Sequence, residues 1–180
     1  MSKYAFNHVN PQQRDNGIWV GSRKLVEITL KGRQSCEIIE KITESIVIFG
    51  GRGDQEKAEI LVTASQKKNM VTVAGHYNLR ESMALISMCN GAVASDSGLG
   101  HISANLGVPT ASIFGAGDSE LSSPIGIKTE VINENVHCSP CLKNTCSNRE
   151  EPLLCINEIS PELPWNILTK LMKNANFDLN

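Results

Sequence analysis

Short apolar runs alternate with stretches of helical periodicity along most of the chain. The helical patterns span about 34–43, 54–67, 78–91, 99–106 and 161–173. The apolar runs between them have the length and bounding residues of buried strands; they are IWVG (18–21), SIVIFGG (45–51), MVTVAG (70–75), GAVAS (91–95), TASIF (110–114) and TEVIN (129–133). This alternation predicts an α/β fold, a Rossmann-like doubly wound parallel sheet with helices on both faces.

Two of the expected helices carry start signals. Asp54 stands directly before the second helical pattern, where an acidic side chain can cap the free amides. Asn78 and Glu81 have the spacing of a capping box, in which each side chain accepts from the backbone amide of the other. Both signals place helix starts just after strands, as the alternating fold requires.

Composition narrows the class of protein. The chain has 180 residues, 41% of them hydrophobic, and a formal net charge of −2, which suits a soluble domain and gives no electrostatic footprint for nucleic acid. No apolar run approaches the roughly 18 residues of a membrane span, and the first residues lack the apolar segment of a secretory signal. We therefore expect a cytoplasmic protein whose six cysteines are reduced thiols or metal ligands.

The expected organisation has three parts. Residues 1–16 are polar and aperiodic and are predicted to be a flexible segment. A nucleotide-sugar-binding, Rossmann-like domain is predicted over 17–174, including a cysteine-rich loop at 137–156, and a short tail over 175–180.

The segment that follows the strand at 91–95 holds the strongest candidate site. Asp96, Ser97 and Gly98 fall beyond the carboxyl end of that strand, where open parallel sheets bind ligands. The next helix points its N-terminal amides and dipole at the same place, an arrangement that suits a phosphate or diphosphate. Gly98 and Gly100 allow an anion to approach the backbone, Ser97 can donate a hydroxyl, and His101 lies in the first helical turn.

A simpler interpretation of this segment is a tight turn from strand to helix. Aspartate and serine are ordinary N-caps, and glycines serve turns. A carboxylate at Asp96 would repel a diphosphate, so it either caps backbone amides or holds a sugar hydroxyl. The residues alone leave both interpretations open.

The sequence SDSGLGHISANLGVPTASIFG (95–115) resembles the signature of family 9 glycosyltransferases, the ADP-heptose:lipopolysaccharide heptosyltransferases. The matching residues are Asp96, Ser97, Gly98, His101, Ala104, Leu106, Gly107, Pro109, Phe114, Gly115 and Asp118. The likeness covers about 17–170. It implies a GT-B fold, of which this chain would be the C-terminal, donor-binding half.

The resemblance also implies roles for particular residues. Asp96, Ser97, Gly98 and His101 would contact the diphosphate and the sugar of an ADP-heptose-like donor. Tyr77 would either stack on the base or be buried against the sheet. The basic residue that stabilises the leaving group would be Lys24, beside Arg23, and transfer would require no metal. Together with Gly100 from the backbone argument above, the predicted donor-binding residues are Asp96, Ser97, Gly98, Gly100, His101, Tyr77 and Lys24.

The match departs from the family where catalysis is concerned. The family's general base is an aspartate in an N-terminal, acceptor-binding domain, whereas only about 16 unpatterned residues precede the first expected strand here. Catalytic residues are thus unassigned, and we expect a separate acceptor-binding domain or chain, with peripheral association with the inner membrane. The alternatives are a non-catalytic nucleotide-binding or partner-docking remnant, and half of another GT-B enzyme such as a sugar-nucleotide epimerase.

Four cysteines form a C-x2-C-x4-C-x8-C array. They are Cys138, Cys141, Cys146 and Cys155. Four thiolates suit a tetrahedral structural zinc ion and also an iron–sulfur cluster, with His137 able to replace one ligand. Alternatively the thiols are only packed, or Cys138 and Cys141 form a redox pair. Cys36 and Cys89 lie inside helical patterns and are expected in the core.

Overall fold

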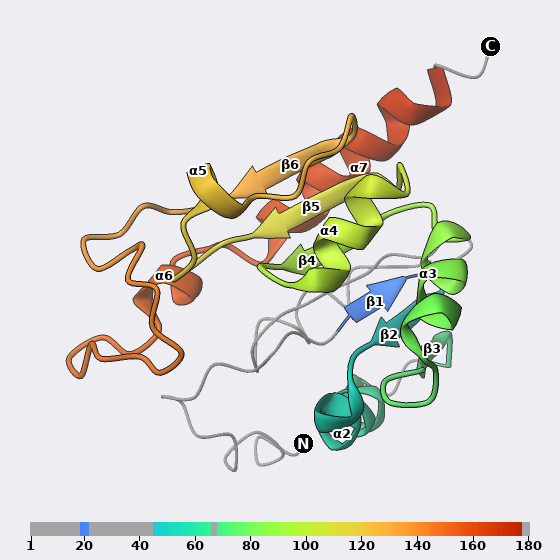
Figure 1. Ribbon diagram of the computed structural model, residues 1–180. Helices are drawn as coiled ribbons and strands as arrows, with labels where there is room; N and C mark the ends of the chain where they lie inside the picture. The colour runs from blue at the N-terminus through green and yellow to red at the C-terminus, as the bar shows by residue number, and fades with distance from the viewer. Residues whose placement is uncertain (1–18, 22–44, 66–67, 178–180) are drawn as a thin grey trace.

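The computed structural model describes residues 19–21, 45–65 and 68–177, which form a six-stranded sheet with helices packed against it (Figure 1). The expected flexible segment, the helix at 34–43, Lys24 and Cys36 lie outside the described residues. The elements are β1 (Trp19–Gly21), β2 (Ile46–Phe49), a 3-10 turn η1 (Arg52–Asp54), α2 (Gln55–Ser65), β3 (Met70–Thr72), α3 (Leu79–Ser87), β4 (Ala92–Ser95), α4 (Gly98–Asn105), β5 (Thr110–Ile113), α5 (Ser119–Ser122), β6 (Thr129–Ile132), α6 (Leu154–Asn157) and α7 (Glu162–Phe177).

The strand order is β3-β2-β1-β4-β5-β6. The pairs β2–β3, β4–β5 and β5–β6 are parallel, whereas β1 is antiparallel to both of its neighbours, with Val20 opposite Ile48 and Val93. The predicted α/β fold class is confirmed, and β1 departs from the parallel arrangement. An antiparallel neighbour needs no crossover helix, so a short strand can enter the sheet in this direction.

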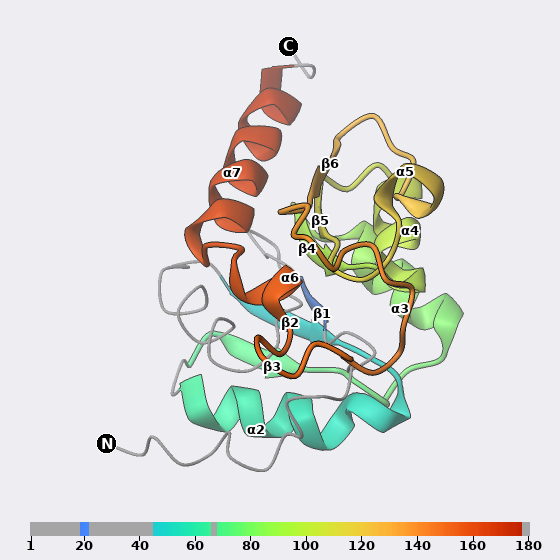
Figure 2. The same cartoon turned by 90° about the vertical axis from the view of Figure 1, so that its left-hand side faces the viewer.

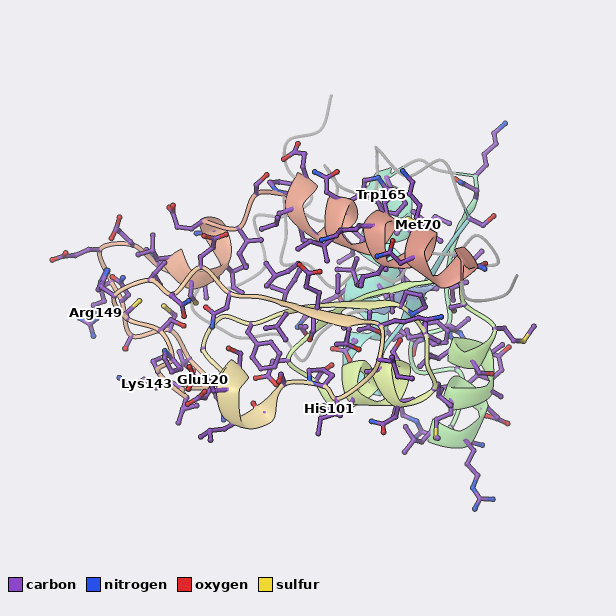
Figure 3. The ribbon with its side chains drawn as sticks, turned by 90° about the horizontal axis from the view of Figure 1, so that it is seen from above. Met70, His101, Glu120, Lys143, Arg149 and Trp165 are labelled. Carbon is purple, nitrogen blue, oxygen red and sulfur yellow. The ribbon has the colours of Figure 1, made fainter. Side chains whose placement is uncertain are left out.

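Helices cover both faces of the sheet. Alternate residues of β2 serve the two faces: Ile46 and Ile48 contribute to one core and Phe49 to the other, as the two-residue period of a strand requires. Seen from above in Figure 3, α7 with Trp165 lies on one side of the sheet and α4 with His101 on the other. The first core, beneath α2 and α7, includes Ala58, Leu61, Val93, Ala111, Ile113, Ile132 and Leu168. The second, beneath α3 and α4, includes Ile86, Ala92, Ala94 and Val108, with Cys89 packed against it.

The capping box predicted for α3 is confirmed. Asn78 Oδ1 accepts from the Glu81 amide at 3.1 Å, and Glu81 Oε2 accepts from the Asn78 amide at 2.8 Å. Asp54 does directly precede α2, but its carboxylate points back and accepts from the Gly51 amide at 2.9 Å. It therefore closes the 3-10 turn after β2, and only 7% of its surface is exposed.

Three helices differ from the sequence prediction. α7 extends to Phe177, so the first three residues of the expected tail (175–180) are helical. The four-residue helices α5 and α6 were not predicted, because four residues are too few to show a periodicity. Within the described ranges, no helix has the length and apolar character needed to cross a bilayer.

Candidate functional site

The carboxyl ends of the parallel strands meet at one edge of the sheet, which faces the viewer in Figure 2. Ser95 at the end of β4 lies in register with Ile113 at the end of β5. The pairing continues one step further, because the Asp96 amide donates to the Ile113 carbonyl at 3.0 Å. The loops after β4 and β5 therefore start side by side, as the sequence predicted for the candidate site.

The start of α4 presents hydrogen-bond donors. The first helical bond is donated by the Gly100 amide to the Ser97 carbonyl at 3.1 Å, so the amides of Gly98 and Leu99 precede the helical ladder. Ser97 is the N-cap residue but its side chain makes no capping bond. Its Oγ is buried and has no hydrogen-bond partner in the described part of the chain. The simple N-cap interpretation of the Ser97 side chain is therefore wrong.

The space beside Gly98 is open. Gly98 is exposed, and a Cβ atom built on it would meet no atom within 4 Å. Gly100 is buried within the first turn, and His101, in the same turn, is half-buried. The start of α4 is thus exposed to solvent at Gly98 and buried at Gly100.

Asp96 follows β4 and Asp118 follows β5, and their carboxylates make different contacts. Asp118 is the N-cap of α5, where its Oδ1 accepts from the amides of Glu120 at 3.0 Å and Leu121 at 3.4 Å. Asp96 is exposed, and its Oδ2 lies directly over the Cα of Gly117. The Asp118 carboxylate is therefore committed to a local cap, whereas the Asp96 carboxylate lies at the edge of a cavity.

This cavity, of about 130 Å³, lies between the carboxyl edge of the sheet and the cysteine-rich loop. Its wall contains all four cysteines of the array together with Asp96, and also Ser95, Ile113, Gly115, Ala116, Gly117, Ser147, Asn148, Leu153, Leu154 and Ile156. Ser97, Gly98, Gly100 and His101 do not line it. Pockets for whole organic ligands measure several hundred Å³, so this cavity does not enclose a nucleotide sugar.

The cysteine-rich loop (137–156) is anchored to the loop after β5. Ser139 Oγ donates to the Gly115 carbonyl, and the Leu142 amide donates to the Ala116 carbonyl at 2.8 Å. A Cβ atom on Gly115 would stand 2.6 Å from Cδ1 of Ile156 in α6. The G-A-G sequence at 115–117 is the signal for this close packing, but glycines at this spacing do not by themselves distinguish a packing motif from a turn.

The structure brings the four predicted metal ligands to one cavity without forming a coordination shell. Each cysteine is half-buried, and none is in a disulfide. Among the residues that the structure describes, no three Cys, His, Asp or Glu side chains are arranged to hold one ion. His137, considered as a substitute ligand, is exposed and does not line the cavity.

Tyr77 lies apart from the Asp96 segment. It follows β3, the outermost strand, and is therefore separated from the β4 loop by β2 and β1. Its side chain is 49% exposed, so the alternative of burial against the sheet is wrong. The second basic candidate, Arg23, lies outside the described residues, as Lys24 does.

Comparisons with known proteins agree on one family. The model of glycosyltransferase family 9 (heptosyltransferase) matches residues 36–151. The chain is 28% identical over 127 residues to lipopolysaccharide heptosyltransferase 1 of Pseudomonas aeruginosa, covering 63% of this chain and 35% of that protein. It is 25% identical over 137 residues to lipooligosaccharide heptosyltransferase 2 of Campylobacter jejuni, covering 74% and 42%. The chain thus spans less than half the length of these curated relatives.

Two solved structures share the fold. With ADP-heptose lipopolysaccharide heptosyltransferase II of E. coli the TM-score is 0.64 at 21% identity, over 79% of this chain and 41% of that one. With a family 9 glycosyl transferase of Veillonella parvula the TM-score is also 0.64, at 17% identity, over 93% and 44%. At these identities the likeness establishes the fold alone.

Proposed function

The chain belongs to glycosyltransferase family 9, and from this premise we propose that it binds the nucleotide-sugar donor of a heptosyltransferase-type enzyme. The donor is ADP-heptose or a similar ADP-sugar, and the sugar goes to lipopolysaccharide core or a related glycan. Because the chain spans 35% and 42% of two relatives' lengths, the proposal for this chain concerns donor binding. The acceptor site and the general base belong to another domain or chain.

One observation carries the proposal: the buried Ser97 hydroxyl has no partner in the described chain and stands at the open start of α4. A buried hydroxyl without a partner costs about 1–3 kcal/mol. Once the Ser97 hydroxyl turns outward about χ1, a phosphate oxygen at the start of α4 would accept from Ser97 Oγ and from the amides of Gly98 and Leu99. The dipole of α4 adds to this attraction, since its positive end faces the anion.

Asp96 is suited to the sugar rather than the diphosphate. Its negative charge would repel phosphate oxygens, whereas a carboxylate is a strong acceptor for a sugar hydroxyl. His101 lies one turn into α4 and can donate to a phosphate oxygen as the leaving group gains charge. These two side chains would therefore hold the donor on either side of the bond that breaks.

In this proposal Tyr77 binds the adenine of the donor, and Lys24 adds charge beside the diphosphate. Tyr77 is exposed enough to stack on adenine, at the same edge of the sheet as the β4 loop. Lys24 supplies positive charge for the diphosphate in this proposal, and its structure is not described. Charge stabilisation by helix amides and basic side chains accounts for the leaving group without a catalytic metal.

Calorimetry on the full chain tests the proposal. We expect ADP and ADP-heptose to bind, with UDP binding more weakly, and Ser97→Ala to reduce ADP affinity about tenfold. Ser87→Ala is the matched control, because Ser87 lies at the end of α3 and its hydroxyl donates locally to the Ala84 carbonyl at 2.7 Å. Absence of ADP binding at millimolar concentration would reject the proposal. A preference for uridine nucleotides would favour another type of GT-B enzyme.

A further inference from the structure

The cysteine-rich loop (137–156) is more strained than its packing explains. No helix or strand lies between β6 and α6 in the described structure, and ordered loops beyond about 12–15 residues are uncommon unless they are functional or cross-linked. Leu142 and Leu153 have positive φ angles of 54° and 61°, which cost a non-glycine residue about 1–2 kcal/mol each. Leu142 is 70% exposed, so burial of its side chain does not offset this cost.

The two leucines flank the thiols of the array. Leu142 directly follows Cys141, and its amide is fixed to the Ala116 carbonyl. Leu153 precedes α6, which carries Cys155, and its amide donates to Cys146 Sγ at 3.3 Å. Both positions of unusual backbone thus lie close to cysteines that line the same cavity.

Two of the sulfurs already accept hydrogen bonds. Besides the Leu153 amide on Cys146, the Asn148 side-chain amide donates to Cys138 Sγ at 3.8 Å. N–H donors directed at sulfur are also found around metal-bound cysteines. The Cys146 thiol in turn donates to the Asn148 carbonyl at 3.7 Å, a bond that metal binding would replace. The thiolate is the form that binds a metal ion.

We propose that the cysteine-rich loop binds one Zn²⁺ ion in the cavity through Cys138, Cys141, Cys146 and Cys155. As the side chains stand, no shell is formed. All four cysteines line the same cavity, and rotation about χ1 would turn their thiols toward an ion in it. Neutral thiols have nothing that draws them together, whereas the ion supplies the free energy for this rearrangement and releases the thiol protons to solvent.

The ion has a structural role. Four protein ligands close the tetrahedral shell and leave no open position for a substrate. The same wall of the cavity contains Asp96, and Ser139 and Leu142 tie the loop to Gly115 and Ala116. Zinc would therefore hold the loop against the segment that positions the Asp96 carboxylate.

Cobalt substitution tests the site without any nucleotide. The full chain, reduced and stripped of metal, is titrated with Co²⁺ and the thiolate-to-cobalt charge-transfer absorption is followed, then Zn²⁺ is added. We expect one equivalent of Co²⁺ with the spectrum of a tetrahedral thiolate site, displaced by one equivalent of Zn²⁺. Cys146→Ser and Cys155→Ser should each weaken metal binding more than about tenfold.

Cys89→Ser is the matched control. Cys89 is half-buried like the four, but it packs against the core beneath α3 and α4 and does not line the cavity, so its loss should leave the metal titration unchanged. Should the loop variants fail to fold, alkylation of the unmutated chain decides: Zn²⁺ should protect the four thiols and leave Cys89 as reactive as before.

Three outcomes would overturn the proposal. They are no charge-transfer absorption together with equal alkylation with and without Zn²⁺, a disulfide between two of the four cysteines in the freshly purified chain, and an iron–sulfur chromophore in place of zinc. None of these measurements depends on donor binding, so the metal site and the proposed function can fail separately.

Discussion

Oδ2 of Asp96 occupies the space that a Cβ atom on Gly117 would take. The loop after β4 therefore packs closely against the loop after β5 at Gly117. The Asp96 carboxylate can lie there because Gly117 has no side chain. Gly115, two residues earlier, gives α6 the same close approach. The two glycines position the two sides of the cavity.

Replacing Gly117 should move the Asp96 carboxylate. A methyl group at this position overlaps Oδ2, so in Gly117→Ala the carboxylate must rotate away. If Asp96 holds a sugar hydroxyl, affinity for ADP-heptose falls about tenfold while affinity for ADP changes little. Calorimetry with both ligands measures this difference.

Gly53→Ala is the control for that experiment, since a Cβ atom there meets nothing within 4 Å and the φ angle of Gly53 lies outside the left-handed region. Equal affinity of the Gly117→Ala and unmutated chains for ADP-heptose would contradict the role given to Asp96.

Gly115→Ala should destabilise the contact between α6 and the sheet. The new methyl group would stand 2.6 Å from Cδ1 of Ile156 and 3.1 Å from Sγ of Cys155, and overpacking of this kind costs about 1–3 kcal/mol. Ile156→Val removes Cδ1, so the double variant should recover much of the lost free energy of unfolding. Urea denaturation of the three variants measures this recovery. If the double variant lost the sum of the free energies of unfolding that the two single variants lose, the clash would not be the cause.

Ser97→Ala should separate stability from binding. The hydroxyl that it removes is buried and has no partner among the residues that the structure describes, so the free energy of unfolding should hold steady or rise even as ADP affinity falls. Thr110→Val is the contrasting case, because Thr110 Oγ1 is buried and hydrogen-bonded to the Val108 carbonyl at 2.7 Å; it should lose about 1 kcal/mol. A clear loss of stability in Ser97→Ala would mean that the hydroxyl has a structural partner in the intact chain.

The sequence predicted what depends on local pattern. The strands from β2 to β6, the α3 capping box and the position of Asp96 after β4 all follow from apolar runs and start signals a few residues long. The direction of β1 did not, since a three-residue strand carries no mark of its orientation. The contact between Asp96 and Gly117 joins residues 21 positions apart, and only the pairing of β4 with β5 brings them together. The shared cavity of the four cysteines likewise depends on how α6 packs against Gly115.

The pair Asp96 and Asp118 offers the sharpest test of the proposed donor site. Both follow neighbouring parallel strands, but Asp118 caps α5, and asparagine is an equally good cap. Asp96→Asn keeps the size of the side chain and removes its charge. Affinity for ADP-heptose should fall about tenfold, because a hydrogen bond to a charged acceptor contributes about 1.5–3 kcal/mol, whereas affinity for ADP should hold steady or rise as repulsion of the diphosphate is lost. Asp118→Asn should change neither. If Asp96→Asn instead weakened ADP and ADP-heptose equally, the carboxylate would be acting through the phosphate-binding backbone, and its assignment to the sugar would be wrong.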